Sequence, residues 1–215
     1  MRIAVLGATG RTGRAVISAA VAAGHEVVAY VRRPEAVIRA DGVRPVGGEV
    51  DDVDTMAAAL IGCDAVVVTL GTTVTRPTAP VMWTAIPTVI DACQVAGVAR
   101  VIVLSALGVG ETLAAVRFPY RLVVRTALIA PFRDHVAGES LLVGSGLEWT
   151  TIHPGLLGDG AATADPLVVD AASRRAMPGW PRTERADVAA VMLRIIDDPE
   201  TFGRRLVVLS EPQAA

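Results

Sequence analysis

The chain has 215 residues, of which 52% are hydrophobic and 20% are charged, with a formal net charge of −2. This composition fits one globular domain with a substantial core and excludes a disordered chain. The near-neutral charge gives no reason to expect binding to nucleic acid or to a membrane surface, and the absence of lysine excludes Schiff-base chemistry.

The N-terminus and the two cysteines indicate a cytoplasmic protein. Met1 leads directly into the strand-like run "RIAVLG", which leaves no room for a signal peptide, and no apolar run reaches the ~18 residues needed to span a bilayer. Cys63 and Cys93 lack the spacing of a metal site or a redox pair, so we interpret them as buried thiols. We expect no metal, and a monomer or a homodimer.

Short β-branched runs alternate with alanine-rich segments through the first half of the chain. We expect strands at 2–7, 25–31, 43–48, 64–70 and 100–105, and helices over about 11–23, 53–61 and 81–96. Gly24 and Gly97 follow two of these helices, where C-terminal caps belong. Continuous apolar strands separated by helix-length crossovers predict an α/β fold with a doubly wound, Rossmann-like parallel sheet.

The pattern loosens after Ser105. Prolines interrupt the apolar segment 107–133 before a helix near 134–144 and a strand at 147–153. Segment 155–183 is rich in proline and glycine, with a possible strand at 166–171. A final helix over about 188–197, capped by Asp187, precedes a strand at 204–210 that closes the sheet. We therefore expect one domain, 1–215, with a small C-terminal lobe in which 107–133 and 155–183 form the substrate pocket.

The segment "GATGRTG" lies between the first strand and the first helix. A helix N-terminus with unpaired N–H groups attracts phosphate. In this position Gly7 allows a tight turn, Gly10 lets the backbone approach a pyrophosphate, and Gly13 lets the helix pack close to the sheet. Thr9 and Thr12 add hydroxyl donors. The segment predicts a dinucleotide-binding turn.

The end of the second strand carries arginines instead of an acid. An NAD site places Asp or Glu there for the ribose 2′-hydroxyl, whereas this chain has Arg32 and Arg33. Guanidinium groups suit a 2′-phosphate, and Arg11 in the glycine turn could reach the same phosphate. The alternative is that these are solvated loop arginines. Together they favour NADP(H) as the cofactor.

Several motifs along nearly the whole chain resemble one family. They are "MRIAVLGATGRTG", "VGGEVDD", "VVVTLGT", "VIVLSALGVG", "RDHVAGESLLVGSGLEWTTIHPGLLGD" and "RTERADVAAVML". The chain resembles the atypical short-chain dehydrogenase/reductases, in particular the NmrA-like group and the NAD(P)H-binding reductases similar to biliverdin reductase B, also called flavin reductase. These motifs are specific for the fold family and much less so for the substrate.

The resemblance implies positions for the rest of the cofactor site. Glu49, which replaces the family's usual aspartate, and Val50 would lie beside the adenine. Three residues after the fourth strand would border the ribose and phosphates: Leu70, Gly71 and Thr72. Four residues after the sixth strand would border the nicotinamide: Pro154, Gly155, Leu156 and Leu157.

The sequence lacks the usual set of catalytic residues of related dehydrogenases. Related dehydrogenases use a Ser, Tyr and Lys constellation, but Tyr120 is followed four residues later by Val124 and no lysine exists. A tyrosine with a lowered pKa is therefore not expected as the general acid. Ser105, at the end of the fifth strand, either orients the substrate or nicotinamide by hydrogen bonding or bonds only to local backbone.

The three histidines and five aromatic residues supply the remaining candidates. We interpret His25 as a surface residue and propose that His135 faces the pocket and gives a proton. For His153 a structural role is favoured over a catalytic one. The aromatic side chains either wall the substrate pocket or serve in core packing or a subunit contact: Trp83, Phe118, Tyr120, Phe132 and Trp180.

The sequence therefore predicts an NADPH-dependent reductase. Hydride transfer is cofactor chemistry, and a conjugated acceptor such as a flavin, quinone or tetrapyrrole needs no strong proton donor. The first alternative is a redox-sensing or regulatory protein that binds NADP(H) without turnover, and a weaker alternative is an epimerase or isomerase.

Overall fold

The structure is a computed structural model that describes residues 1–71 and 80–210. Its centre is an eight-stranded sheet in the order β3-β2-β1-β4-β5-β6-β10-β8. Only β8 runs antiparallel to its neighbour, β10, and the other strands are parallel. The strands are β1 (Arg2–Leu6), β2 (Glu26–Val31), β3 (Val43–Gly47), β4 (Ala65–Val68), β5 (Arg100–Leu104), β6 (Glu148–Pro154), β8 (Leu167–Asp170) and β10 (Arg204–Leu209). This order confirms the doubly wound, Rossmann-like fold, in which ligands bind outside the carboxyl ends of the strands where the strand order reverses.

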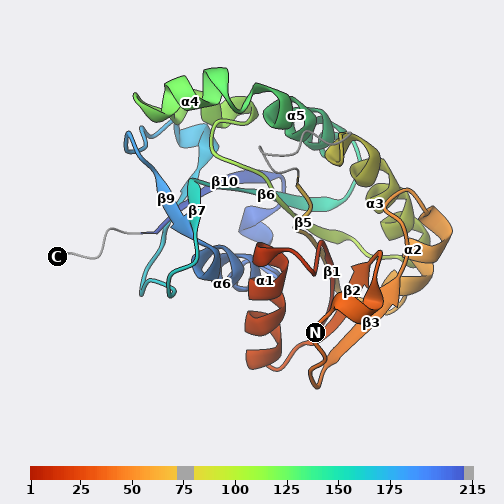
Figure 1. Cartoon of the computed structure of the whole chain (residues 1–215). Helices are drawn as coiled ribbons and strands as arrows, with labels where there is room; N and C mark the ends of the chain where they lie inside the picture. Colours follow the sequence, from red (N-terminus) through yellow and green to blue (C-terminus); the bar gives the residue numbers. More distant parts are fainter. Residues whose placement is uncertain (72–79, 211–215) are drawn as a thin grey trace.

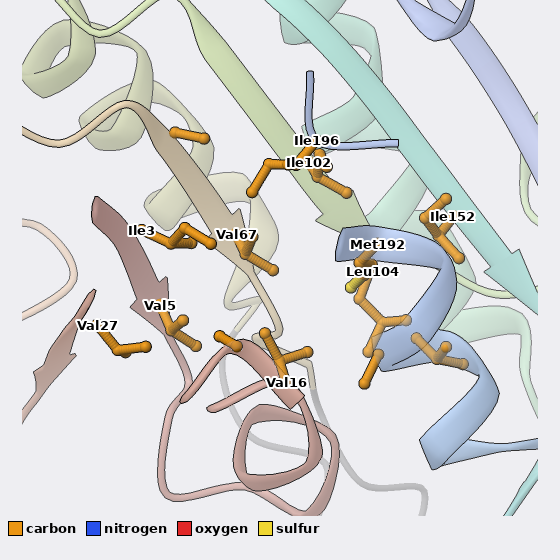
Figure 2. Packing of buried hydrophobic residues seen from close by; sticks show 14 of the residues in the cluster. Ile3, Val5, Val16, Val27, Val67, Ile102, Leu104, Ile152, Met192 and Ile196 are labelled. Carbon is orange, nitrogen blue, oxygen red and sulfur yellow. The ribbon is translucent and has the colours of Figure 1, made fainter. Parts of the chain in front are cut away.

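Helices cover both faces of the sheet (Figure 1). One face carries α1 (Arg11–Ala22) and α6 (Arg185–Arg194), and the other carries α2 (Val53–Leu60), α3 (Met82–Ala96) and α5 (Ile129–Val143). Figure 2 shows the first face, where Val16 of α1 and Met192 of α6 belong to one hydrophobic cluster with strand residues such as Val67. Because both faces are buried, the central strands are continuously apolar, as the sequence predicted.

The second face depends on a close approach of α3 and α5. A Cβ atom at Gly138 would lie 3.0 Å from the Cβ of Met82, so glycine lets the two helices pack at short range. The carboxylate of Asp134 on α5 accepts hydrogen bonds from the N–H groups of Val81, Met82 and Trp83 at 2.9–3.0 Å. The first turn of α3, which lacks a side-chain cap of its own, is thus capped by another helix.

Arg100 joins β5 to the end of α6. Its guanidinium is buried and donates to the carbonyls of Ile195, Ile196 and Glu148 at 2.7–3.0 Å. Lysine, with one ammonium group, would not reach these divergent acceptors from one position. The arginine therefore adds donors to carbonyl groups just after α6, of which Ile195 also accepts from the N–H of Asp198 at 3.2 Å.

The C-terminal half adds short elements beside the main sheet. They are η2 (Gly110–Ala115), α4 (Tyr120–Thr126), η3 (Ala171–Ser173) and the two-stranded sheet of β7 (Leu156–Gly158) and β9 (Arg182–Glu184). A separate hydrophobic cluster fills the space between α4 and the edge of the main sheet and includes Leu107, Tyr120 and Val207. None of the described helices is long and apolar enough to cross a membrane.

Three expectations about the second half were wrong. α5 begins at Ile129 rather than near 134, because Pro131 lies in its first turn, where proline is tolerated. α6 begins at Arg185, and Asp187 is not its cap, because its carboxylate instead accepts from the backbone N–H of Thr163 at 2.7 Å. β10 does not close the sheet, since β8 pairs along its outer side.

Candidate functional site

The glycine turn has little room for side chains. Gly7 has a φ of +79°, and a Cβ atom there would lie 2.8 Å from the carbonyl oxygen of Thr69. A Cβ atom at Gly13 would lie 2.3 Å from the carbonyl oxygen of Gly7. Gly13 is thus required by the backbone of the turn itself, not by contact with the sheet as expected. The N-cap of α1 is Gly10, and no side chain caps this helix. An anion could therefore bind the first N–H groups of α1 without displacing a side chain.

A pocket of about 120 Å³ lies beside this turn. It is lined by six of the residues expected at the cofactor site: Gly7, Thr9, Arg32, Arg33, Val50 and Leu70. Five further lining residues were missed by the sequence analysis: Leu6, Tyr30, Val31, Ala36 and Gly48. Among the described residues, no carboxylate belongs to this lining. The pocket therefore combines the glycine turn with two arginines and no acid.

Tyr30 and Gly48 shape one wall of the pocket. The Tyr30 hydroxyl donates to the carbonyl of Glu49 at 2.8 Å, and a Cβ atom at Gly48 would lie 2.1 Å from the Tyr30 oxygen. Burial raises the pKa of Tyr30 to about 12, so the phenol is neutral. The Glu49 side chain is exposed and does not line the pocket, whereas Val50 does. The double glycine after the third strand was the available sequence signal.

The three arginines expected at the cofactor phosphate differ in their surroundings. Arg32 and Arg33 are exposed and form no ion pair with another described residue. Arg11 pairs with Asp159, in the loop after β7, and Asp159 also pairs with Arg185 at 2.6 Å. The charge of Arg11 is thus directed toward the C-terminal lobe, and a phosphate contact by Arg11 stays a prediction.

Of the other expected cofactor residues, Gly71 lies near α5, because a Cβ atom there would be 3.9 Å from Nε2 of His135. Thr72 is outside the described residues. Thr12 is buried in the first turn of α1. Leu156 is exposed and Leu157 half-buried on β7, and Pro154 ends β6.

Gly155 is fixed by the small sheet. Its N–H donates to Thr183 Oγ1 at 2.8 Å, and a Cβ atom there would lie 2.6 Å from the carbonyl oxygen of Pro181.

Ser105 lies at the carboxyl end of β5 and is buried. Its N–H donates to the carbonyl of Ile152 at 2.7 Å, and its hydroxyl donates to Oε1 of Glu139 on α5. Ser105 is therefore bonded to more than local backbone. Glu139 was missed by the sequence analysis, although it lies four residues after His135 and so on the same helix face. Burial raises the pKa of Glu139 above the usual glutamate value.

His153 is fully buried beside Glu139. Its Nδ1 is 3.0 Å from the carbonyl of Ala106, which can only accept, so Nδ1 carries the proton and Nε2, 2.8 Å from Thr151 Oγ1, accepts from the hydroxyl. Burial lowers the pKa of His153 to about 4. The neutral imidazole with both nitrogens bonded fits the structural role favoured for this residue.

His135 is also buried, but Nδ1 has no hydrogen-bond partner among the described residues. Burial lowers its pKa below the usual histidine value, with the nearby Glu139 opposing the shift. The imidazole is therefore neutral at pH 7, which weakens its expected role as a proton donor.

The aromatic candidates separate into two groups. Tyr120 is buried with its hydroxyl 3.4 Å from the carbonyl of Leu107, and burial raises its pKa to about 12. Phe132 packs against the same hydrophobic cluster, whereas Trp83, Phe118 and Trp180 are exposed. His25 is half-buried near the N-terminal amine, and Cys63 and Cys93 are free buried thiols.

Segments 107–133 and 155–183 meet around an open cavity of about 570 Å³. Its lining comes from both segments: Gly110, Glu111, Leu113, Ala114, Arg121, Ala171, Ala172 and Arg174. Among residues 1–71 and 80–210, no group of three or more His, Cys, Asp or Glu side chains is placed to hold a metal ion.

The sheet order, the glycine turn and the pocket at the switch point define a dinucleotide-binding protein. A family model described as NAD(P)H-binding matches residues 7–199, so the chain belongs to that family. It is of the atypical short-chain dehydrogenase/reductase type, as its motifs predicted.

Among solved structures, ChuY, an anaerobillin reductase from Escherichia coli O157:H7, is 24% identical with a TM-score of 0.78, and the match covers 100% of this chain and 99% of that one. A short-chain dehydrogenase/reductase from Veillonella parvula DSM 2008 is 15% identical with a TM-score of 0.81, over 99% and 94% of the two chains. At these identities the likeness shows the fold.

A sequence relative is photosystem II assembly factor Ycf39 from Synechocystis, 34% identical over 115 residues, which make up 52% of this chain and 35% of that protein. The aligned segments cover 23% and 35% of two curated relatives, so this chain matches only part of their length.

Proposed function

We propose that this protein is an NADPH-dependent reductase that transfers hydride to a small conjugated acceptor, such as a flavin, a quinone or a linear tetrapyrrole. The observation that carries the cofactor choice is the pocket beside the glycine turn, which has Arg32 and Arg33 in its lining and no carboxylate. An acid for the ribose 2′-hydroxyl is absent from that lining, and guanidinium groups suit a 2′-phosphate.

The choice of acceptor follows from the missing tyrosine–lysine pair, which in related dehydrogenases protonates a ketone as hydride arrives. Tyr120 is buried with a raised pKa, His135 and His153 are neutral, and the chain has no lysine. An isolated ketone needs a proton donor as hydride arrives, whereas a conjugated acceptor spreads the incoming charge. The likeness to an anaerobillin reductase supports including a linear tetrapyrrole among the acceptors.

In this proposal the nicotinamide lies near Pro154–Leu157 and the acceptor lies between segments 107–133 and 155–183. Ser105 and His135 contact the acceptor or the nicotinamide. The cofactor supplies the hydride, and the chain supplies alignment of the two reactants and exclusion of water.

An assay panel tests the proposal. The purified protein is given NADPH or NADH with FMN, menadione, biliverdin or a simple aliphatic ketone, and cofactor oxidation is followed at 340 nm. Turnover of at least one conjugated acceptor with NADPH, above the rate without protein, is the expected result. Turnover of the ketone alone overturns the acceptor class.

The alternatives give different results in the same experiment. Similar, tight binding of NADPH and NADP⁺ with no turnover of any acceptor favours the redox-sensing protein. That alternative rests on the missing tyrosine–lysine pair. Product formation without net oxidation of the cofactor indicates an epimerase or isomerase.

A further inference from the structure

The contact between Ser105 and Glu139 places a buried carboxyl group at the ligand-binding edge of the sheet. Ser105 follows the carboxyl end of β5, and Glu139 is only 4% exposed. A Cβ atom at Gly110 would lie 3.9 Å from Oε2 of Glu139, so the carboxyl group is enclosed from the η2 side as well. Among the described residues, a second polar contact of this carboxyl group is Nε of Arg205, 3.6 Å from Oε2.

The charged and titratable groups around Glu139 come from four elements. They are His135 on the same helix, His153 on β6, Arg205 on β10 and, through Arg205, Glu111 on η2. Both histidines are held neutral by burial.

Arg205 is shared between two carboxylates. Its Nε lies 3.6 Å from Oε2 of Glu139, but its Nη1 lies closer, 3.0 Å, to the exposed Glu111. Among the described residues, no cation is therefore fully committed to Glu139. A buried carboxylate in this position is costly, and taking up a proton relieves that cost.

The protonation state of Glu139 determines what Ser105 can do, because a serine hydroxyl has a single proton. If Glu139 is ionised, Ser105 donates to it and can only accept hydrogen bonds from a ligand. If Glu139 is protonated, it donates to the serine oxygen, and the serine proton is free to point to a ligand at the carboxyl edge of the sheet.

We propose that Glu139 stores the proton that reaches the reduced product, and that it acts through Ser105. This inference rests on the proposed reductase function. Hydride from NADPH first converts the acceptor to its reduced anion and leaves NADP⁺. The serine O–H bond then breaks as its proton passes to the anion, while the Glu139 proton forms a new O–H bond on the serine. Glu139 is left as a carboxylate and takes up a proton from water before the next turnover.

An infrared titration of the cofactor-free protein tests the proton store without any substrate. The difference between wild type and Glu139→Gln at pH 6 should contain a protonated-carboxyl band that disappears at higher pH. Glu148→Gln, which removes an exposed carboxylate, is the control and should leave that band in place. Ser105→Ala should make the band persist to higher pH, because the serine hydrogen bond favours the ionised form. An ionised Glu139 at pH 6 overturns the proposal.

Steady-state kinetics with the conjugated acceptor test whether the Glu139 proton reaches the product through Ser105. Wild-type turnover should rise as the pH falls through the Glu139 titration. Glu139→Gln should remove that rise and slow the acidic rate about tenfold, less than the roughly 100-fold low end of a general-acid effect because a conjugated acceptor can also take a proton from water. The double variant Ser105→Ala/Glu139→Gln should be no slower than Ser105→Ala, since both residues serve one transfer. Additive losses, or an unchanged pH profile in Glu139→Gln, contradict delivery through the serine.

The two proposals fail in distinguishable ways. If no acceptor is reduced, the reductase function is wrong, and the infrared titration still decides whether Glu139 holds the proton. If Glu139→Gln does not fold, by circular dichroism, then the wild-type and Ser105→Ala titrations decide, with isotope-labelled glutamate identifying the band.

Discussion

Removing the Arg32 guanidinium should weaken NADPH binding and leave NADH binding almost unchanged. Arg32 lines the pocket beside the glycine turn, is exposed, and forms no ion pair with a described residue. Arg32→Ala therefore breaks no internal contact that would destabilise the fold. The variant should therefore lose affinity for NADPH without losing stability.

The magnitude follows from the chemistry of one charge-assisted hydrogen bond. Losing such a bond costs about 1–3 kcal/mol, which is about 5- to 140-fold in Kd. The exposed position puts the effect toward the lower part of this range at physiological salt, and lower ionic strength should increase it. Arg33→Ala should act in the same direction, because Arg33 lines the same pocket.

Isothermal titration calorimetry with both cofactors, at one ionic strength, measures the effect. Arg39→Ala is the matched control, since Arg39 is an exposed arginine in the same loop but does not line the pocket. Equal losses for NADPH and NADH in Arg32→Ala would show that this arginine does not contact the 2′-phosphate. An equal loss in Arg39→Ala would indicate general charge attraction instead of a specific contact.

Four further changes test the fold and the site. In urea unfolding, Gly13→Ala should lower the free energy of unfolding by about 1–3 kcal/mol, because its Cβ would lie 2.3 Å from the Gly7 oxygen. Gly144→Ala is the control and should be nearly neutral, because a Cβ atom there meets no atom within 4 Å. Arg100→Met should cost about 3 kcal/mol or more in the same assay, since the carbonyls of Ile196 and Glu148 lose their guanidinium donors. His153 is protonated only near pH 4 in the folded protein but near pH 6.5 in the unfolded chain, so wild-type stability falls as the pH drops through that window. His153→Gln should make this fall in the free energy of unfolding smaller by up to about 3 kcal/mol. His135→Ala should slow turnover of a conjugated acceptor by less than about 100-fold, with NADPH affinity retained, because protonation of such an acceptor follows hydride transfer.

A control variant or a contrary result checks each of these expectations. Arg125→Met, on the exposed side of α4, should leave stability unchanged. Unchanged acid sensitivity in His153→Gln would refute the assignment to His153. A loss of several thousandfold in folded His135→Ala would show that the proton step dominates and that the acceptor is not of the conjugated class.

The sequence by itself determined the sheet and the cofactor turn. Both depend on local patterns: the continuous apolar strands of a doubly covered sheet, and the glycines that a strand-to-helix turn requires. The place of Arg32 and Arg33 beside the turn was also predictable, because they follow a strand whose neighbour leads into the turn. Each of these features is complete within a few residues, so short-range pattern alone indicates it.

Only the tertiary structure decided which side chains meet in the site. Glu139 contacts Ser105 across 34 residues, and Asp134 caps a helix that begins 52 residues earlier. The register of β8 beside β10 and the pairing of Arg11 with Asp159 are likewise contacts between distant segments. Such contacts depend on how whole helices and strands pack. The burial that raises the pKa of Glu139 and lowers that of His153 exists only once the helices cover the sheet, so no local pattern encodes it.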